Sequence, residues 1–273
     1  MKTIMKTRVL VILICWGGQL FAQGKKENAE ALNKFMHVCR SYQQAPMHAQ
    51  ISIQTTFNLP AAGTDTAAHD ADFYLLKDAA YIRFGNLEEV VSDSQALVIS
   101  HDIRRMVIYT DAKPMIDNMR SSMTFGLDRK RLDQLARTCQ AIQSPTVDGK
   151  ASIHLASVKT VSGTGLATDS IMLEYNATTD EPYRIMQWSR SLLSIDSSSY
   201  YSLLKQPNWK GKTVKTDGGY FLVREQMTHF IYRQIEHGAS VVMPAHIADR
   251  VNRNSSGDYE PVAAYTNYLL TQN

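Results

Sequence analysis

Methionines at helical spacing are the residues in this sequence that point most directly to a chemistry, the binding of apolar groups. Met115, Met119 and Met123 recur at every fourth position, so a helix would place them on one face. Methionine is unbranched and polarisable, and a stripe of it can conform to an irregular guest such as an acyl chain. A helix that only packs on a sheet shows the same stripe, and taken alone the stripe favours core packing.

Histidines, serines and acids form no catalytic or metal-binding pattern. The sequence holds 8 histidines, but neither His-Glu-x-x-His nor Cys-x-x-Cys occurs. It contains no Gly-x-Ser-x-Gly elbow and no glycine-rich phosphate loop, and its acid pairs fall in predicted turns. We therefore predict a non-enzymatic protein without a cofactor or metal site. A hydrolase on a β scaffold is the disfavoured alternative.

Residues 1–22 are typical of a cleaved secretory signal peptide. Three cations and no acid stand in the first eight residues, an apolar run covers 9–16, and small Ala22 precedes Gln23. The run is too short to span a membrane. Cys15 lies inside it after bulky Ile14, which disfavours lipid modification. We predict export to the periplasm, envelope or medium, with no transmembrane segment after cleavage.

The predicted mature chain, 23–273, is electrically balanced. Of 29 Lys and Arg, three lie in the signal peptide, and 26 remain against 26 Asp and Glu. Without a basic excess we expect no attraction to nucleic acid or to anionic lipid surfaces. The length fits one large β-rich domain, and we find no repeat or linker. We expect a monomer.

Cys39 and Cys139 are the two cysteines beyond the predicted signal peptide. Thiols in an oxidising compartment tend to pair, so we predict a disulfide between them. An intermolecular bridge and two buried thiols remain the alternatives.

Hydrophobic periodicity predicts a helix, then strands, then a helical interruption, then strands. The first helix covers 28–42, and strands follow at 49–57, 73–76, 80–84, 89–91, 96–99 and 104–109 as an antiparallel meander. Two helices fill the insertion 113–142, the second with Leu135, Cys139 and Ile142 on its apolar stripe until Pro145. Later strands are expected at 152–158, 170–175, 183–189, 220–235, 240–243, 245–253 and 261–270, whereas 200–212 is difficult to assign.

The segment 82–109 resembles the periplasmic lipoprotein-carrier and outer-membrane lipoprotein-sorting family (LolA/LolB-like). Ser92-Asp93-Ser94 stands where that family has a Ser-Asp-Gly turn, and Asp102 precedes the basic pair Arg104-Arg105 and an apolar strand. The order of elements agrees as well. The resemblance implies a mainly β fold with helices (α+β), an unclosed antiparallel β-barrel with an N-terminal helix and a helical lid over its concave face. Strand 50–57 lacks the arginine with which carriers hold the lid, so a charge-driven lid cycle is not expected.

The resemblance and the methionine stripe together predict an exported binding protein of the cell envelope whose cavity takes lipid or lipoprotein acyl chains. The predicted lipid-binding residues are Met106, Met115, Ile116, Met119, Met123 and Phe125. The alternative is an envelope scaffold with the same fold, a filled cavity and a protein partner. Trp188, Trp209 and the Tyr200-Tyr201 pair would then mark the partner surface.

Overall fold

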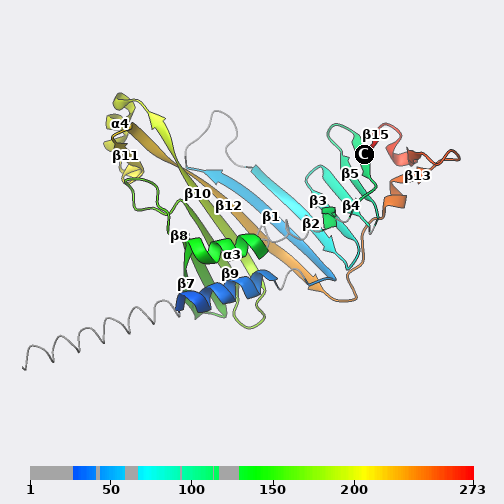
Figure 1. Ribbon diagram of the computed structural model, residues 1–273, viewed down its shortest axis with the longest axis horizontal. Coiled ribbons are helices and arrows are strands. Elements are labelled where there is room, and N and C mark those ends of the chain that lie inside the picture. The colour runs from blue at the N-terminus through cyan, green and yellow to red at the C-terminus, as the bar shows by residue number, and fades with distance from the viewer. Residues whose placement is uncertain (1–26, 41–43, 59–66, 93, 113, 117–128) are drawn as a thin grey trace, which may run out of the picture.

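The structure is a computed structural model that describes residues 27–40, 44–58, 67–92, 94–112, 114–116 and 129–273. Within these residues, 13 strands form one long curved sheet, with the main path β15-β6-β5-β4-β3-β2-β1-β12-β10-β9-β8-β7 (Figure 1). The end strands β7 and β15 do not pair with each other, so the sheet stays open. The predicted fold class, an α+β unclosed antiparallel β-barrel with an N-terminal helix, is confirmed.

The first half of the sheet consists of β1 (Met47–Phe57), β2 (Ala67–Leu75), β3 (Ala80–Phe84), β4 (Leu87–Val91), β5 (Ala96–Ser100) and β6 (Arg105–Tyr109). The second half consists of β7 (Cys139–Val147), β8 (Lys150–Ser157), β9 (Asp169–Asn176), β10 (Pro182–Ile195), β11 (Thr213–Thr216) and β12 (Gly219–His237). The C-terminal strands are β13 (Val251–Arg253), β14 (Tyr259–Pro261) and β15 (Leu269–Gln272). The helices are 27–40, α3 (Arg129–Thr138) and α4 (Ser197–Leu204), with 3-10 turns η1 (Pro207–Trp209), η2 (Ile247–Asp249) and η3 (Ala263–Tyr265).

Strand β12 joins the two halves of the sheet, because it pairs antiparallel with β1 on one side and with β10 on the other. The predicted strand 220–235 is therefore confirmed. Strands β2 to β6 pair in chain order, which confirms the predicted meander. The segment 197–204, which periodicity left unassigned, is helix α4 with Asp196 as its N-cap.

The main hydrophobic core lies on the concave face of the sheet, where helix 27–40 packs. Phe35 and Val38 of this helix are completely buried, and they share one cluster with inward side chains such as Ile51, Leu173 and Ile185. Successive strand residues point to opposite faces, so this core uses every second residue of each strand. The predicted helix 28–42 thus matches the described helix 27–40 and covers the sheet as expected.

The C-terminal segment covers the opposite, convex face of the meander. Leu97, Ile99, Met106 and Ile108 project from β5 and β6 into a second cluster with Val251. The predicted closing strands at 240–243, 245–253 and 261–270 are largely wrong, because this segment packs its apolar side chains from 3-10 turns and three short strands. The hairpin around 254–257 is confirmed, and β15 adds a parallel edge strand to β6.

The predicted second helix of the insertion is too long. Helix α3 ends at Thr138, and Cys139–Val147 form β7, which pairs with β8. Cys139 is 9% exposed and Ile142 is 64% exposed, so they face opposite sides, as strand residues an odd number apart do. Strand β8 pairs with β9 on one side only, so its other edge is available to residues 139–147. Pairing with that edge stabilises a strand there, although the local sequence has a helical period.

Candidate functional site

A cavity of about 720 Å³ lies between helix α3 and the concave face of the second half of the sheet. Helix α3 crosses this half of the sheet in the foreground of Figure 1. The cavity is lined by Gln134, Leu135, Thr138, Cys139, Leu155, Ser157, Asp169, Ser170, Ile171, Gln187, Trp188, Ser189, Gln226 and Thr228.

Two rows of cross-strand neighbours form the floor of this cavity. The first row runs from Leu155 to Ile171, Gln187 and Thr228, each paired with the next across β8, β9, β10 and β12. The second row includes Asp169, Ser189 and Gln226. Because paired residues share a face, all these side chains point toward α3.

The lining is apolar on one side and polar on the other. Leu135 of α3, Leu155 and Ile171 supply the apolar part, and Ile171 is 9% exposed. Gln187, Gln226, Thr228 and other amides and hydroxyls supply hydrogen-bonding groups. Asp169 is the one charged residue among the described lining residues. The cavity is therefore suited to an amphiphile with an apolar part and a neutral or cationic polar part.

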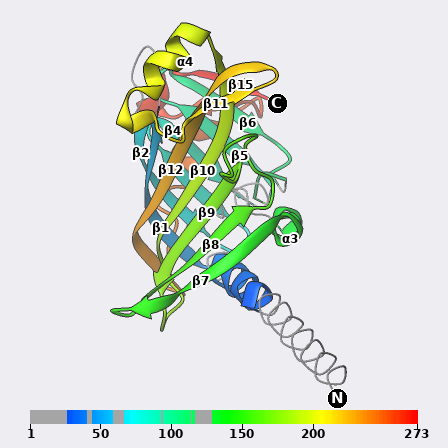
Figure 2. The ribbon, with the colours of Figure 1, turned by 90° about the vertical axis from the view of Figure 1, so that its left-hand side faces the viewer.

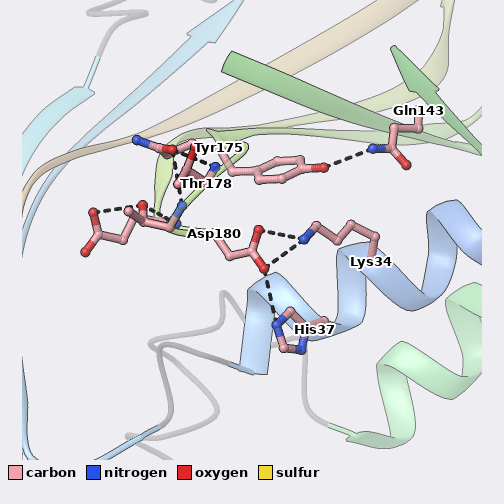
Figure 3. Close-up of polar contacts among 9 residues, drawn as sticks. Lys34, His37, Gln143, Tyr175, Thr178 and Asp180 are labelled. Atoms are coloured by element: carbon pink, nitrogen blue, oxygen red, sulfur yellow. Dashed lines mark hydrogen bonds and ion pairs between the residues drawn. The ribbon is translucent and has the colours of Figure 1, made fainter. Parts of the chain in front are cut away.

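An ion pair fixes helix 27–40 to the turn between β9 and β10 (Figure 3). Lys34 Nζ donates to both carboxylate oxygens of Asp180 at 2.6 and 2.7 Å, and His37 Nε2 lies 3.2 Å from Asp180 Oδ2. The Lys34 ammonium also lies 5.6 Å from the centre of the Tyr175 ring. At the other end of the helix, Asn28 Oδ1 accepts a hydrogen bond from the backbone N–H of Ala141 in β7. The helix thus forms a fixed wall on the concave side.

The predicted lipid-binding residues do not form one group in the structure. Met115 and Ile116 pack with the concave-face core, in line with their predicted side of the sheet. Met106 is completely buried in the convex cluster, so its assignment to the same cavity is wrong, because its position in β6 points it away from α3. Met119, Met123 and Phe125 lie outside the described residues.

Sequence reasoning missed the polar lining residues Gln187, Gln226 and Thr228. Their positions in the sequence could have revealed them. Each lies an even number of residues from Ile185 or Phe230, inward residues of the same strands, and therefore faces the same side of the sheet. Polar residues at inward positions indicate a cavity that the core does not fill. The Trp188 side chain lies on the opposite face of β10 from Gln187, with its ring centre 6.4 Å from that of His154, so its role at a partner surface stays a prediction.

The two cysteines are free thiols in the structure, so the predicted disulfide is wrong. Cys39 is 2% exposed on helix 27–40, and burial raises the pKa of its thiol to about 12. Cys139 begins a strand rather than extending a helical stripe, and burial raises its pKa as well. Both thiols are protonated at neutral pH and behave as small apolar side chains.

The described residues contain no group of three or more His, Cys, Asp or Glu arranged to hold a metal ion. Among the described helices, none has the length and hydropathy to cross a membrane.

Among family models, curated proteins and solved structures, only the solved structures include matches to this chain. No family model matches it, and no curated protein matches it. Among solved structures, a LolA superfamily protein from Nitrosomonas europaea matches at 8% identity and a TM-score of 0.26, over 78% of this chain and 94% of that one. A putative outer membrane lipoprotein-sorting protein domain from Vibrio parahaemolyticus matches at 5% identity and a TM-score of 0.30, over 81% and 96%. Lipovitellin matches at 10% identity and a TM-score of 0.34, over 75% of this chain and 27% of that one.

The fold and the cavity define a class, an open antiparallel half-barrel with a helix-covered cavity on its concave face. The superpositions are loose, and the class rests on the sheet order and packing of this chain.

Proposed function

We propose that this protein is an exported, non-enzymatic binding protein of the cell envelope that holds a lipid or the acyl chains of a lipoprotein under helix α3. The observation that carries the proposal is the unfilled space of about 720 Å³ on an otherwise packed concave face. Its volume lies in the range of small-molecule sites, roughly 300–1,000 Å³.

The chemistry of the lining favours an amphiphile. Leu135 of α3 and Ile171, which is 9% exposed, offer apolar area to a chain, whereas Leu155 is 1% exposed and belongs to the core. The amides and hydroxyls beside them are suited to an ester, amide or hydroxyl near its head. Met115 and Ile116 pack on the same hydrophobic core but are not among the residues that line the cavity. Helix α3, the part of the predicted insertion that lies over the cavity, acts in this proposal as the lid.

A binding titration with a matched tryptophan pair tests the proposal. Gln187→Trp places a bulky ring in the middle of the cavity floor, whereas Gln272→Trp places the same ring at an exposed position on β15. We expect Gln187→Trp to weaken binding of a fluorescent fatty-acid analogue by about tenfold or more, since an overfilled cavity excludes the chain. Gln272→Trp should bind like the wild type. Equal affinities for all three proteins would contradict the proposal, and circular dichroism verifies that each variant is folded.

The scaffold function remains the second candidate because one part of the concave face is already filled. Phe35 and Val38 occupy the space above Leu173 and Ile185 with no exposed area of their own. A protein that binds no probe while keeping its fold would favour this function.

A further inference from the structure

The far end of β10 and β12 carries a surface separate from the cavity. Strand β9 pairs with β10 only as far as Ser189, and β10 continues to Ile195 alongside β12. Helix α4, η1 and β11 are attached there, and they project from the sheet in Figures 1 and 2. We call residues 192–224 the tip.

Exposed apolar side chains gather on one face of the tip. Tyr201 is 51% exposed and Leu204 is 48% exposed, and their three-residue spacing places them on one side of α4. Leu193 is 46% exposed and pairs with Leu222, on the same sheet face as Tyr220. The Tyr220 ring lies 4.8 Å from that of Tyr200 and 5.8 Å from that of Tyr201, so α4 sits on that face.

The same segment is rich in lysine, and Lys215 Nζ lies 5.5 Å from the centre of the Tyr220 ring. Lys205, Lys210, Lys212 and Lys215 fall within 197–216, a stretch that contains no acid. Of the flanking acids, Asp196 accepts hydrogen bonds from Ser198 and Ser199 as the N-cap of α4, and Glu225 pairs with Arg190 at 2.6 Å. Asp217 is the third flanking acid. The near-neutral balance of the whole chain therefore conceals a local positive surface.

We infer that the tip docks on an anionic lipid membrane. Partial insertion of exposed Leu and Tyr, together with lysines at the level of the headgroups, is the combination that holds proteins at a membrane surface. Charge complementarity selects an anionic bilayer over a neutral one. This revises the sequence-based expectation that no anionic lipid surface would attract the chain, which rested on net charge alone.

The inward face of β10 links the tip to the cavity. Ser189 lines the cavity, and Leu193 and Ile195 lie on the same face of the strand, toward α4. A tip docked by this face turns the cavity side toward the bilayer. That last step rests on the proposed function, whereas the docking itself does not.

Vesicle co-sedimentation tests the docking. All of the proteins compared begin at the same residue, so they differ only in the substitutions named below. Wild-type protein is mixed with vesicles of phosphatidylcholine alone or with about 30 mol % phosphatidylglycerol. The charge variant is Lys205→Gln/Lys210→Gln, and its control is Lys77→Gln/Lys150→Gln, in the β2–β3 turn and at the first residue of β8. The apolar variant is Tyr201→Ser/Leu204→Ser, and its control is Ile103→Ser, an exposed position in the β5–β6 turn.

We expect binding to the anionic vesicles only, weaker by about 25-fold in the lysine variant and by about tenfold or more in the apolar variant. Both controls should stay within about twofold, and about 0.5 M salt should reduce binding. Equal binding to both vesicles, no binding, or equal losses in the controls would overturn the docking, including the case in which the tip binds a protein instead. The fatty-acid titration of Gln187→Trp tests ligand binding in the cavity, so its outcome does not depend on whether the tip binds vesicles.

Discussion

Replacing Arg250 by Met is expected to weaken the attachment of the C-terminal segment to the meander. The Glu88 carboxylate is 5% exposed in the convex face of β4, and Arg250 donates to its Oε1 from Nε at 3.2 Å and from Nη2 at 3.0 Å. His101 Nε2 lies 3.1 Å from the other oxygen, Oε2. Methionine keeps much of the apolar stem of arginine and removes the charge.

The magnitude follows from what the substitution leaves behind. Removing one partner of a fully buried pair costs about 3–5 kcal/mol, because the other charge remains unpaired in the protein. Here Arg250 is 21% exposed and His101 is 27% exposed, so water reaches the site and His101 still faces the carboxylate. We expect a loss of about 2–3 kcal/mol in the free energy of unfolding at neutral pH.

Urea unfolding of a double-mutant cycle measures this loss. Glu88→Gln/Arg250→Met removes both charges, so the double variant should be more stable than Arg250→Met by about 1 kcal/mol or more. A loss below about 0.5 kcal/mol for Arg250→Met, or strict additivity of the two single changes, would show that the pair is solvated and does not hold the segment.

Three further predictions concern the cavity, the concave face and the thiols. Met115→Asp should abolish co-purification of lipid while the chain stays folded, since a charge in an apolar wall is costly; loss of the fold, with no lipid on the wild type by mass spectrometry, would make Met115 ordinary core. Burial raises the pKa of Glu89, so its contribution to stability is fully present below the unfolded pKa and is lost as pH rises through the folded value. Glu89→Gln should therefore raise the urea midpoint at pH 7, and this gain should vanish near pH 4; an unchanged midpoint at pH 7 would contradict that reasoning. Cys39 and Cys139 should resist alkylation in the native protein and both react after unreduced unfolding, whereas peptide mapping that finds them joined would refute the free thiols of the structure.

The strands and the first helix could be predicted from sequence because local periodicity and global packing agree in them. The helix 27–40 has a single apolar stripe, and β2 to β6 are separated by turn residues at hairpin spacing. Strand β12 was predictable only from its flanking strands, because its apolar residues suit either period.

The errors fall where a distant partner decides the local structure. Cys139 continues a helical period in sequence, yet the edge of β8 draws it into a strand. Met106 belongs by its type to a methionine group, yet strand parity points it at the C-terminal segment. Parity in the sequence marks Gln187 and Thr228 as inward residues, but they become neighbours in one cavity floor only when β10 and β12 pair. No local pattern records such a pairing.

Native mass spectrometry of the wild-type protein, gently purified from the cells that express it, tests most directly whether the space under α3 holds a ligand. The proposed function predicts one amphiphile per chain, retained in Gln272→Trp and absent from Gln187→Trp. A wild-type protein that carries no ligand, or a Gln187→Trp variant that carries it to the same extent, would contradict a lipid-binding cavity beneath helix α3.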